Sequence, residues 1–187
     1  ISEGYGLSET SPVISLNAPG YQKIGTIGKP VLGTEVKLLD ENGNEVAQGE
    51  AGELAARGPQ VMLGYWNNPQ ETANVMTADG FFKTGDIAIL NEEGFHQIVD
   101  RKKDMIIVSG FNVYPNEVEN VLASHPNIIE CAVVGVKDEH SGEAVKAFVV
   151  LKDDSQDPEL MKTAILNFCR EQLTAYKLHL KILFYYL

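Results

Sequence analysis

The sequence has 187 residues, of which 44% are hydrophobic and 22% charged, and its formal net charge is -11. This length can supply one good core or two small ones, and the composition is that of a globular protein, not a disordered one. The acidic balance excludes a protein that binds the nucleic-acid backbone, because such proteins need surplus Lys and Arg. It does not exclude the binding of a single nucleotide, since one phosphate needs only local donors.

The two cysteines, Cys131 and Cys169, each lie among apolar residues and form no CxxC pair. We interpret them as reduced core residues of a cytosolic protein, not as a disulfide or metal site. No stretch approaches the ~20 apolar residues that a membrane helix needs. Residues 1–4 are no signal peptide, and the apolar segment 178–187 stops without a polar cap, so we expect both ends to be cut or altered.

Residues 1–12 form a loop in which Tyr5 stands between Gly4 and Gly6. The glycines allow the backbone to approach a ligand closely, and the tyrosine ring offers a stacking face for a base. Ser8 offers a hydroxyl donor, and Glu9 offers a carboxylate suited to Mg²⁺. For so short a stretch, a plain surface turn is the simpler interpretation.

Residues 23–99 read as short strands separated by turns, with Asn42-Gly43 as a hairpin signal. Strands at this spacing with glycine-rich turns predict a barrel-like or sandwich subdomain. One helix interrupts them over residues 69–76, with Pro69 in its first position and Asn68 as its cap.

Asp86 lies between a glycine and an apolar strand. A carboxylate at a strand mouth is placed to accept hydrogen bonds from a ribose diol, although an Asp that caps a turn is the commoner case. His96 alternates with apolar neighbours, so we predict that it faces solvent and takes no part in catalysis.

The segment from Asp100 to Asp104 places five consecutive charged residues between two apolar runs. Five adjacent charges cannot be buried together. By itself the segment is either a solvated loop inside one domain or a boundary between two bodies.

Beyond this segment the pattern changes from β-rich to mixed. Residues 115–124 and 158–173 have the apolar spacing of helices, and Asp157 suits the cap of the second. Residues 128–136 predict a buried strand, and residues 145–151 predict another. We therefore predict an α+β fold class, with a β-rich, barrel-like subdomain over residues 1–99, a boundary over 100–104, and a small α+β domain over 105–187.

Three motifs occur in order: Gly4-Tyr5-Gly6-Leu7-Ser8-Glu9-Thr10, Lys83-Thr84-Gly85-Asp86 and Asp100-Arg101-Lys102-Lys103-Asp104. Each alone is a weak signal, and their order makes them a strong one. Together with Gly52-Glu53-Leu54 and residues 57–59 and 64–67, they make the chain resemble adenylate-forming enzymes over roughly residues 1–177. These enzymes include acyl-CoA synthetases, firefly luciferase and peptide-synthetase adenylation domains. The run 98–119 is most similar to bacterial long-chain fatty-acid–CoA ligases.

The resemblance implies an AMP-forming acid–thiol ligase that works in two halves. A fatty acid attacks the α-phosphate of ATP, and after a rotation of the C-terminal lid domain the thiol of coenzyme A attacks the acyl-adenylate. It further implies an ATP/AMP site that uses Tyr5, Gly6, Ser8, Asp86 and Arg101, with Glu9 on Mg²⁺. In the same way, the resemblance implies that residues 100–104 are the hinge, with Lys103 at its pivot, and that Gly110 lies in the loop that lines the thiol channel.

Two parts of the family pattern are absent from this sequence. The Gly/Ser/Thr-rich phosphate loop lies upstream in the family, and the lysine of its Gly-Lys motif lies downstream. Lys177 and Lys181 stand near the expected region but outside that motif, so no catalytic lysine is assigned. Without these two electrostatic stabilisers, we expect the isolated chain to be inactive.

The sequence is compatible with two alternative hypotheses about the function. The parent enzyme is a ligase for an aryl or medium-chain acid, or the chain is a non-catalytic nucleotide-binding or interaction module. We expect a cytoplasmic protein that binds no nucleic acid. Peripheral contact with the inner face of the membrane, and association through uncovered apolar surface, also stay open.

Overall fold

The computed structural model describes residues 2–153, 157–178 and 180–185. The chain divides into two compact units, Ile1–Lys102 and Lys103–Leu187. The division falls inside the charged segment 100–104. In the described residues no helix is long and apolar enough to cross a membrane.

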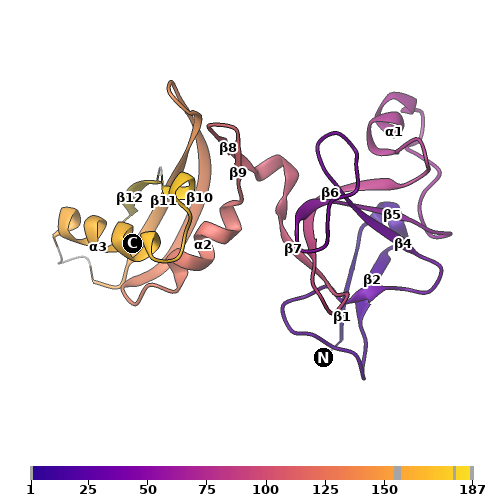
Figure 1. The fold of residues 1–187 in the computed structure, drawn as a ribbon, viewed down its shortest axis with the longest axis horizontal. Coiled ribbons are helices and arrows are strands. Elements are labelled where there is room, and N and C mark those ends of the chain that lie inside the picture. The colour runs from indigo at the N-terminus through magenta and orange to yellow at the C-terminus, as the bar shows by residue number, and fades with distance from the viewer. Residues whose placement is uncertain (1, 154–156, 179, 186–187) are drawn as a thin grey trace. The chain divides into compact units, whose positions relative to one another are not determined.

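The first unit consists of two antiparallel sheets and a short helix (Figure 1). Its three-stranded sheet has the order β1-β2-β3, and its four-stranded sheet has the order β4-β5-β6-β7. The strands are β1 (Glu3–Gly6), β2 (Val13–Asn17), β3 (Lys29–Pro30), β4 (Glu35–Leu39), β5 (Ala51–Arg57), β6 (Phe82–Leu90) and β7 (His96–Arg101). The helices are η1 (Ser8–Thr10) and α1 (Pro69–Val75), and a third, η2 (Lys102–Asp104), crosses the boundary between the units.

Local sequence signals account for the turns of this unit. The Asn42-Gly43 hairpin forms as predicted, because Asp40 Oδ1 accepts bonds from the amides of Asn42 and Asn44. Helix α1 is confirmed as well: Asn68 Oδ1 accepts the Glu71 amide at 3.2 Å, which satisfies an otherwise unpaired donor. The main core consists of Ile14, Leu38, Leu54, Ala56 and Ala88.

The mixed α+β class is confirmed, but the barrel-like arrangement is wrong in one respect. The four-stranded sheet is open in the described residues, with β4 and β7 as its edges. Strand spacing predicts that short strands pair, but it does not predict whether the first and last of them meet.

The second unit is a five-stranded sheet covered on one face by two helices (Figure 1). The strand order is β10-β11-β8-β9, and β12 pairs with β11 in parallel. The elements are β8 (Ile106–Val108), β9 (Phe111–Val113), α2 (Pro115–Ala123), β10 (Ile128–Asp138), β11 (Gly142–Leu151), α3 (Pro158–Arg170), η3 (Ala175–Leu178) and β12 (Leu180–Tyr185).

Every second side chain along β11 points into this core. Val145, Ala147 and Val149 are all buried and belong to one cluster with the apolar faces of α2 and α3. The Asp157 cap of α3 forms as predicted, with Oδ1 accepting the amides of Glu159 and Leu160. Cys169 lies in this core, and burial raises the pKa of its thiol to about 11.

Three expectations for this unit need correction. Strand β10 is not buried throughout, because it has one covered face and one open face; Ile129 is 52% exposed. Helix α3 ends at Arg170, three residues before the predicted end. The apolar tail, for which the sequence predicted no element, forms β12, whose Leu180 and Ile182 are buried against β11.

The prediction that His96 faces solvent is also wrong. Its side chain is buried because the backbone of β7 pairs with Gly28: the His96 amide donates to the Gly28 carbonyl, and the Ile27 amide donates to the His96 carbonyl. In the described part of the chain, His96 Nδ1 is buried without a hydrogen-bond partner. Burial lowers the pKa of this imidazole below its usual value.

A histidine that is buried in its neutral form makes stability depend on pH. Below pH 6.5 the unfolded chain binds a proton that folded His96 resists, so the free energy of unfolding falls as the pH drops through this range. The His96 contribution has a slope of at most about 1.4 kcal/mol per pH unit. Urea unfolding between pH 7 and 5 measures it.

The matched variants are His96→Asn and His140→Asn, because His140 is exposed. We expect His96→Asn to flatten the pH dependence and His140→Asn to leave it unchanged. Equal slopes in the parent chain and His96→Asn would show that this histidine does not control acid stability.

Candidate functional site

A β-bulge in β6 places Asp86. The pairing of β5 with β6 shifts register between Glu53 and Ala55, and Gly85 adopts a φ of 77°, which favours glycine. Thr84 Oγ1 donates to the Leu54 carbonyl at 2.8 Å and accepts the Asp86 amide at 3.2 Å. The Lys-Thr-Gly-Asp motif therefore has a local structural role: it fixes the backbone of the residue that carries the carboxylate.

The Asp86 carboxylate has a partner on each oxygen. The Tyr5 hydroxyl donates to Oδ2 at 2.6 Å, and Arg101 Nε lies 3.7 Å from Oδ1. Arg101 is directly opposite Asp86 in the pairing of β6 with β7. The Asp86 side chain is only 16% exposed, whereas that of Arg101 is 65% exposed. Three of the predicted nucleotide-binding residues thus meet at one point, from β1, β6 and β7.

Tyr5 is anchored by its ring as well as by its hydroxyl. The side chain packs against the main core of the first unit. Burial, and then the hydrogen bond to Asp86, raise the pKa of the phenol well above its usual value. The hydroxyl therefore stays protonated at neutral pH and acts as a donor.

Glu9 and Ser8 lie on η1, the turn after β1. Glu9 is half-buried, and its Oε1 accepts a bond from the Tyr65 hydroxyl at 2.9 Å, whereas Ser8 is exposed. Burial and the Glu9 carboxylate both raise the pKa of Tyr65. A cavity of about 320 Å³ opens beside Glu9, lined among others by Tyr65, Lys83 and Lys102.

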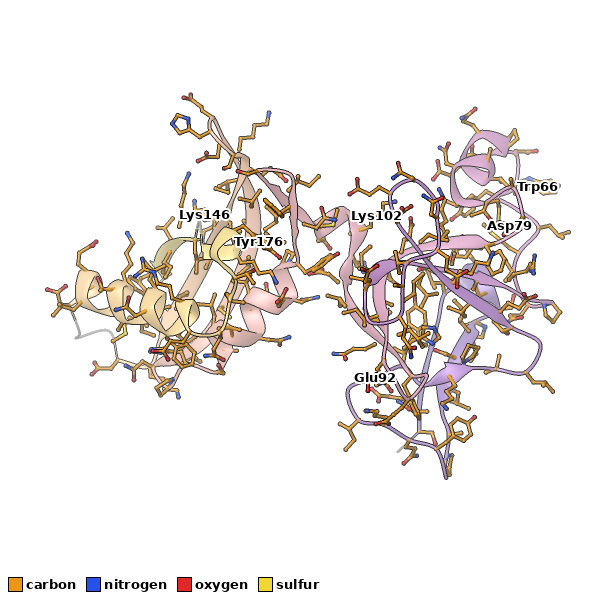
Figure 2. The ribbon with its side chains drawn as sticks, in the orientation of Figure 1. Trp66, Asp79, Glu92, Lys102, Lys146 and Tyr176 are labelled. Carbon is orange, nitrogen blue, oxygen red and sulfur yellow. The ribbon has the colours of Figure 1, made fainter. Side chains whose placement is uncertain are left out.

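Lys102 is held to this cavity by a buried acid. Its Nζ lies 2.7 Å from Oε2 of Glu53, whose side chain is only 9% exposed (Lys102 is labelled in Figure 2). Sequence reasoning missed Glu53, Tyr65 and Lys102 as members of the site. The first two stand in the motif segments 52–54 and 64–67, and no pattern in the sequence pairs them with their partners.

No group of three or more His, Cys, Asp or Glu among the described residues is arranged to hold a metal ion. A Mg²⁺ ion bound to phosphates needs only one or two protein carboxylates, because phosphates and waters supply the remaining ligands. Glu9 fits that requirement, since it is half-buried at the rim of a cavity.

Gly6 has a structural role that the sequence analysis did not give it. A Cβ at this position would collide with the backbone of Pro12 and Val13, so the close approach is to the chain itself. At Gly4 a Cβ would make ordinary van der Waals contacts, with a Leu16 methyl group at 3.7 Å and the Ser15 carbonyl oxygen at 3.9 Å.

Gly110 and Lys103 belong to the second unit. Ser109 and Gly110 both have positive φ, 52° and 84°, and form the two-residue turn between β8 and β9. This is the geometry of a type I′ hairpin, which glycine favours. A Cβ on Gly110 would meet no atom within 4 Å, so the turn, and not crowding, explains the glycine here. Lys103 is exposed in η2.

Comparison with known families identifies the chain. The model for AMP-binding enzymes matches residues 1–66, and the model for the AMP-binding enzyme C-terminal domain matches residues 117–185. The chain belongs to the AMP-binding enzyme family. The two matches lie on either side of the division between the two units.

Relatives cover nearly the whole chain but are much longer. A long-chain-fatty-acid–CoA ligase of Escherichia coli O157:H7 is 55% identical over 94% of this chain and 30% of its own length. A 2-succinylbenzoate–CoA ligase of Geobacillus kaustophilus is 43% identical over 98% of this chain and 37% of its own. The crystal structure of ATP-bound MatB from Rhodopseudomonas palustris is 35% identical, with a TM-score of 0.88 over 99% of this chain and 36% of that chain. The chain thus spans about a third of the length of these relatives.

The two glycines of the first motif provide a direct test of their roles. We expect Gly6→Ala to lower the free energy of unfolding by more than about 3 kcal/mol, because backbone atoms must move to admit the methyl group. Gly4→Ala should change it by no more than about 1 kcal/mol. Urea unfolding of both variants measures the difference, and a Gly6→Ala variant as stable as Gly4→Ala would contradict the clash.

Proposed function

We propose that the chain provides the ribose and adenine part of the nucleotide site, the hinge and the lid domain of a long-chain fatty-acid–CoA ligase. The parent reaction joins a fatty acid to coenzyme A through an acyl-adenylate, with ATP converted to AMP and pyrophosphate. The observation that carries the proposal is the meeting of Tyr5, Asp86 and Arg101.

The chemistry of this group suits the sugar of a nucleotide. Asp86 is a desolvated carboxylate that accepts hydrogen bonds from ribose hydroxyls, and Arg101, which is largely exposed, donates to the same sugar. The Tyr5 ring stacks on adenine, with the Gly6 backbone beside it. Ser8, exposed on η1, donates to the α-phosphate.

Glu9 is our candidate for holding Mg²⁺. An ion bound there would neutralise phosphate charge during attack on the α-phosphate. The chain itself contributes one carboxylate, and the Tyr65 hydroxyl on Oε1 holds that carboxylate in place. Lys83, which lines the same cavity, adds positive charge near it.

The segment 100–104 is the proposed hinge, with Lys103 as its pivot. The ion pair between Lys102 and buried Glu53 holds the residue before the pivot against β5 of the four-stranded sheet. If Lys102 moved away, Glu53 would be left buried without its partner, which costs free energy. Rotation of the backbone is therefore favoured from Lys103 onward. Residues 105–187 then form the lid, and the Gly110 turn is its proposed contact with the coenzyme A thiol arm.

The isolated chain is proposed to be inactive. It lacks the upstream phosphate loop, and neither nearby lysine is available to replace the Gly-Lys lysine. Lys177 Nζ lies 2.6 and 2.7 Å from the two oxygens of Glu117, and Lys181 Nζ lies 2.9 Å from Asp138. Moving Lys177 would leave a partly buried acid without its partner.

We propose a fatty acid as the substrate because the 55% identity to long-chain ligases exceeds the 43% identity to an aryl-acid ligase. We propose a cytoplasmic location, at which the substrate reaches the enzyme from the inner face of the membrane. Self-association of the isolated chain is supported by the exposed apolar side chains of the first unit, of which Trp66, 92% exposed, points away from the unit (Figure 2).

Binding of nucleotide to the chain tests the proposal. We expect AMP, or a non-hydrolysable acyl-adenylate analogue, to bind, and Asp86→Ala to weaken binding at least about ten-fold, since hydrogen bonds to a charged group are lost. Glu92→Ala is the matched control, because it removes the same charge from the exposed β6–β7 turn (Figure 2). Isothermal calorimetry measures both.

Equal affinities of the Asp86→Ala and Glu92→Ala variants would contradict the placement of the ribose. On the same preparation, ATP–pyrophosphate exchange with palmitate should stay at background. Robust exchange would refute the proposed inactivity, and retained binding without exchange separates the site from catalysis.

A further inference from the structure

The two oxygens of Asp86 have different surroundings. Oδ2 accepts the Tyr5 hydroxyl at 2.6 Å, a short bond to a charged acceptor, and such bonds are among the stronger ones in proteins. Oδ1 faces Arg101 Nε at 3.7 Å, beyond direct hydrogen-bond distance, and that arginine is largely exposed. Tyr5 is therefore the tighter of the two restraints on this carboxylate.

Backbone and side chain of Asp86 are restrained separately. Thr84 and the bulge at Gly85 fix the backbone, because Thr84 Oγ1 bridges the Leu54 carbonyl and the Asp86 amide. Neither of these bonds contacts the Asp86 carboxylate. The Tyr5 hydroxyl does contact the carboxylate, from a ring that packs against the main core of the first unit.

A stacking role does not require this hydroxyl. Any flat aromatic ring stacks on adenine, and a phenylalanine would do so without placing a polar group in a largely buried position. The observed hydroxyl is directed at the carboxylate and not at open solvent. Its position suggests a task distinct from stacking.

We propose that Tyr5 is a positioning residue: its hydroxyl locks the Asp86 carboxylate so that Oδ1 is presented to the ribose hydroxyls, and it thereby sets selectivity for nucleotides with a free 2′,3′-diol. This inference rests on the proposed function. It extends that function, because it couples the base-facing aromatic to recognition of the sugar. The Arg101 side chain, opposite Oδ1, then donates to the same sugar.

The test compares Tyr5→Phe with the parent chain in binding ATP and 2′,3′-dideoxy-ATP by calorimetry. Phenylalanine keeps the ring and removes the hydroxyl. We expect the affinity for ATP to fall about ten-fold, and the affinity for the dideoxy nucleotide to change by less than about two-fold, because its sugar makes no bonds to lose. Tyr21→Phe, at an exposed tyrosine, is the matched control and should change neither.

A second measurement needs no nucleotide. Urea midpoints of Tyr5→Phe, Asp86→Ala and the double variant form a cycle, and a bond between the two side chains makes the shifts non-additive. Additive shifts would overturn the inference. Non-additive shifts support the lock on Asp86.

The outcomes separate this inference from the proposal beneath it. If Tyr5→Phe weakens both nucleotides equally, the hydroxyl has no role in reading the sugar, and the inference fails while the nucleotide site stands. If the parent chain binds neither nucleotide, the proposed function fails, and the ribose role of Tyr5 fails with it.

Discussion

The Asp86 carboxylate, held between the Tyr5 hydroxyl and Arg101, is the contact on which the site of the first unit depends. It exists because β6 and β7, which are consecutive strands, pair in the register that places Asp86 opposite Arg101, and because the distant strand β1 brings Tyr5 to the same point. The bulge at Gly85 turns the β6 backbone, and the pairing with β7 places Arg101 opposite. A one-residue slip in either ladder would send the carboxylate to the other face of the sheet.

The strand pairing also sets where the first unit ends. β7 ends at Arg101 inside the charged segment, and the next residue, Lys102, forms an ion pair with Glu53 of β5. The second unit has a separate core, built on one face of β11 with α2 and α3. Each unit therefore has the apolar contacts that it needs, and the charged segment between them contributes to neither core.

Local chemistry could be predicted from the sequence because it depends on neighbouring residues. The caps at Asn68 and Asp157 and the hairpin at Asn42-Gly43 are of this kind. The burial of His96 and the pairing of β12 with β11 depend on partners far along the chain. The backbone contact at Gly6 depends on how the chain turns back at Pro12 and Val13. Hydrophobic periodicity predicts none of these three features. Tyr5 and Asp86 were candidates from their local sequence, and the resemblance added Arg101, whereas the hydrogen bond between Tyr5 and Asp86 required coordinates.

The central claim is that one nucleotide sugar lies against Tyr5, Asp86 and Arg101. The most direct measurement is an NMR titration of the isotope-labelled chain with AMP, followed through the backbone amides. The account predicts that the largest shifts fall on residues 4–9, 84–87 and 100–102, and that the amides of α3 stay unmoved. Shifts that are absent from these three segments, or that centre on α3, would contradict it.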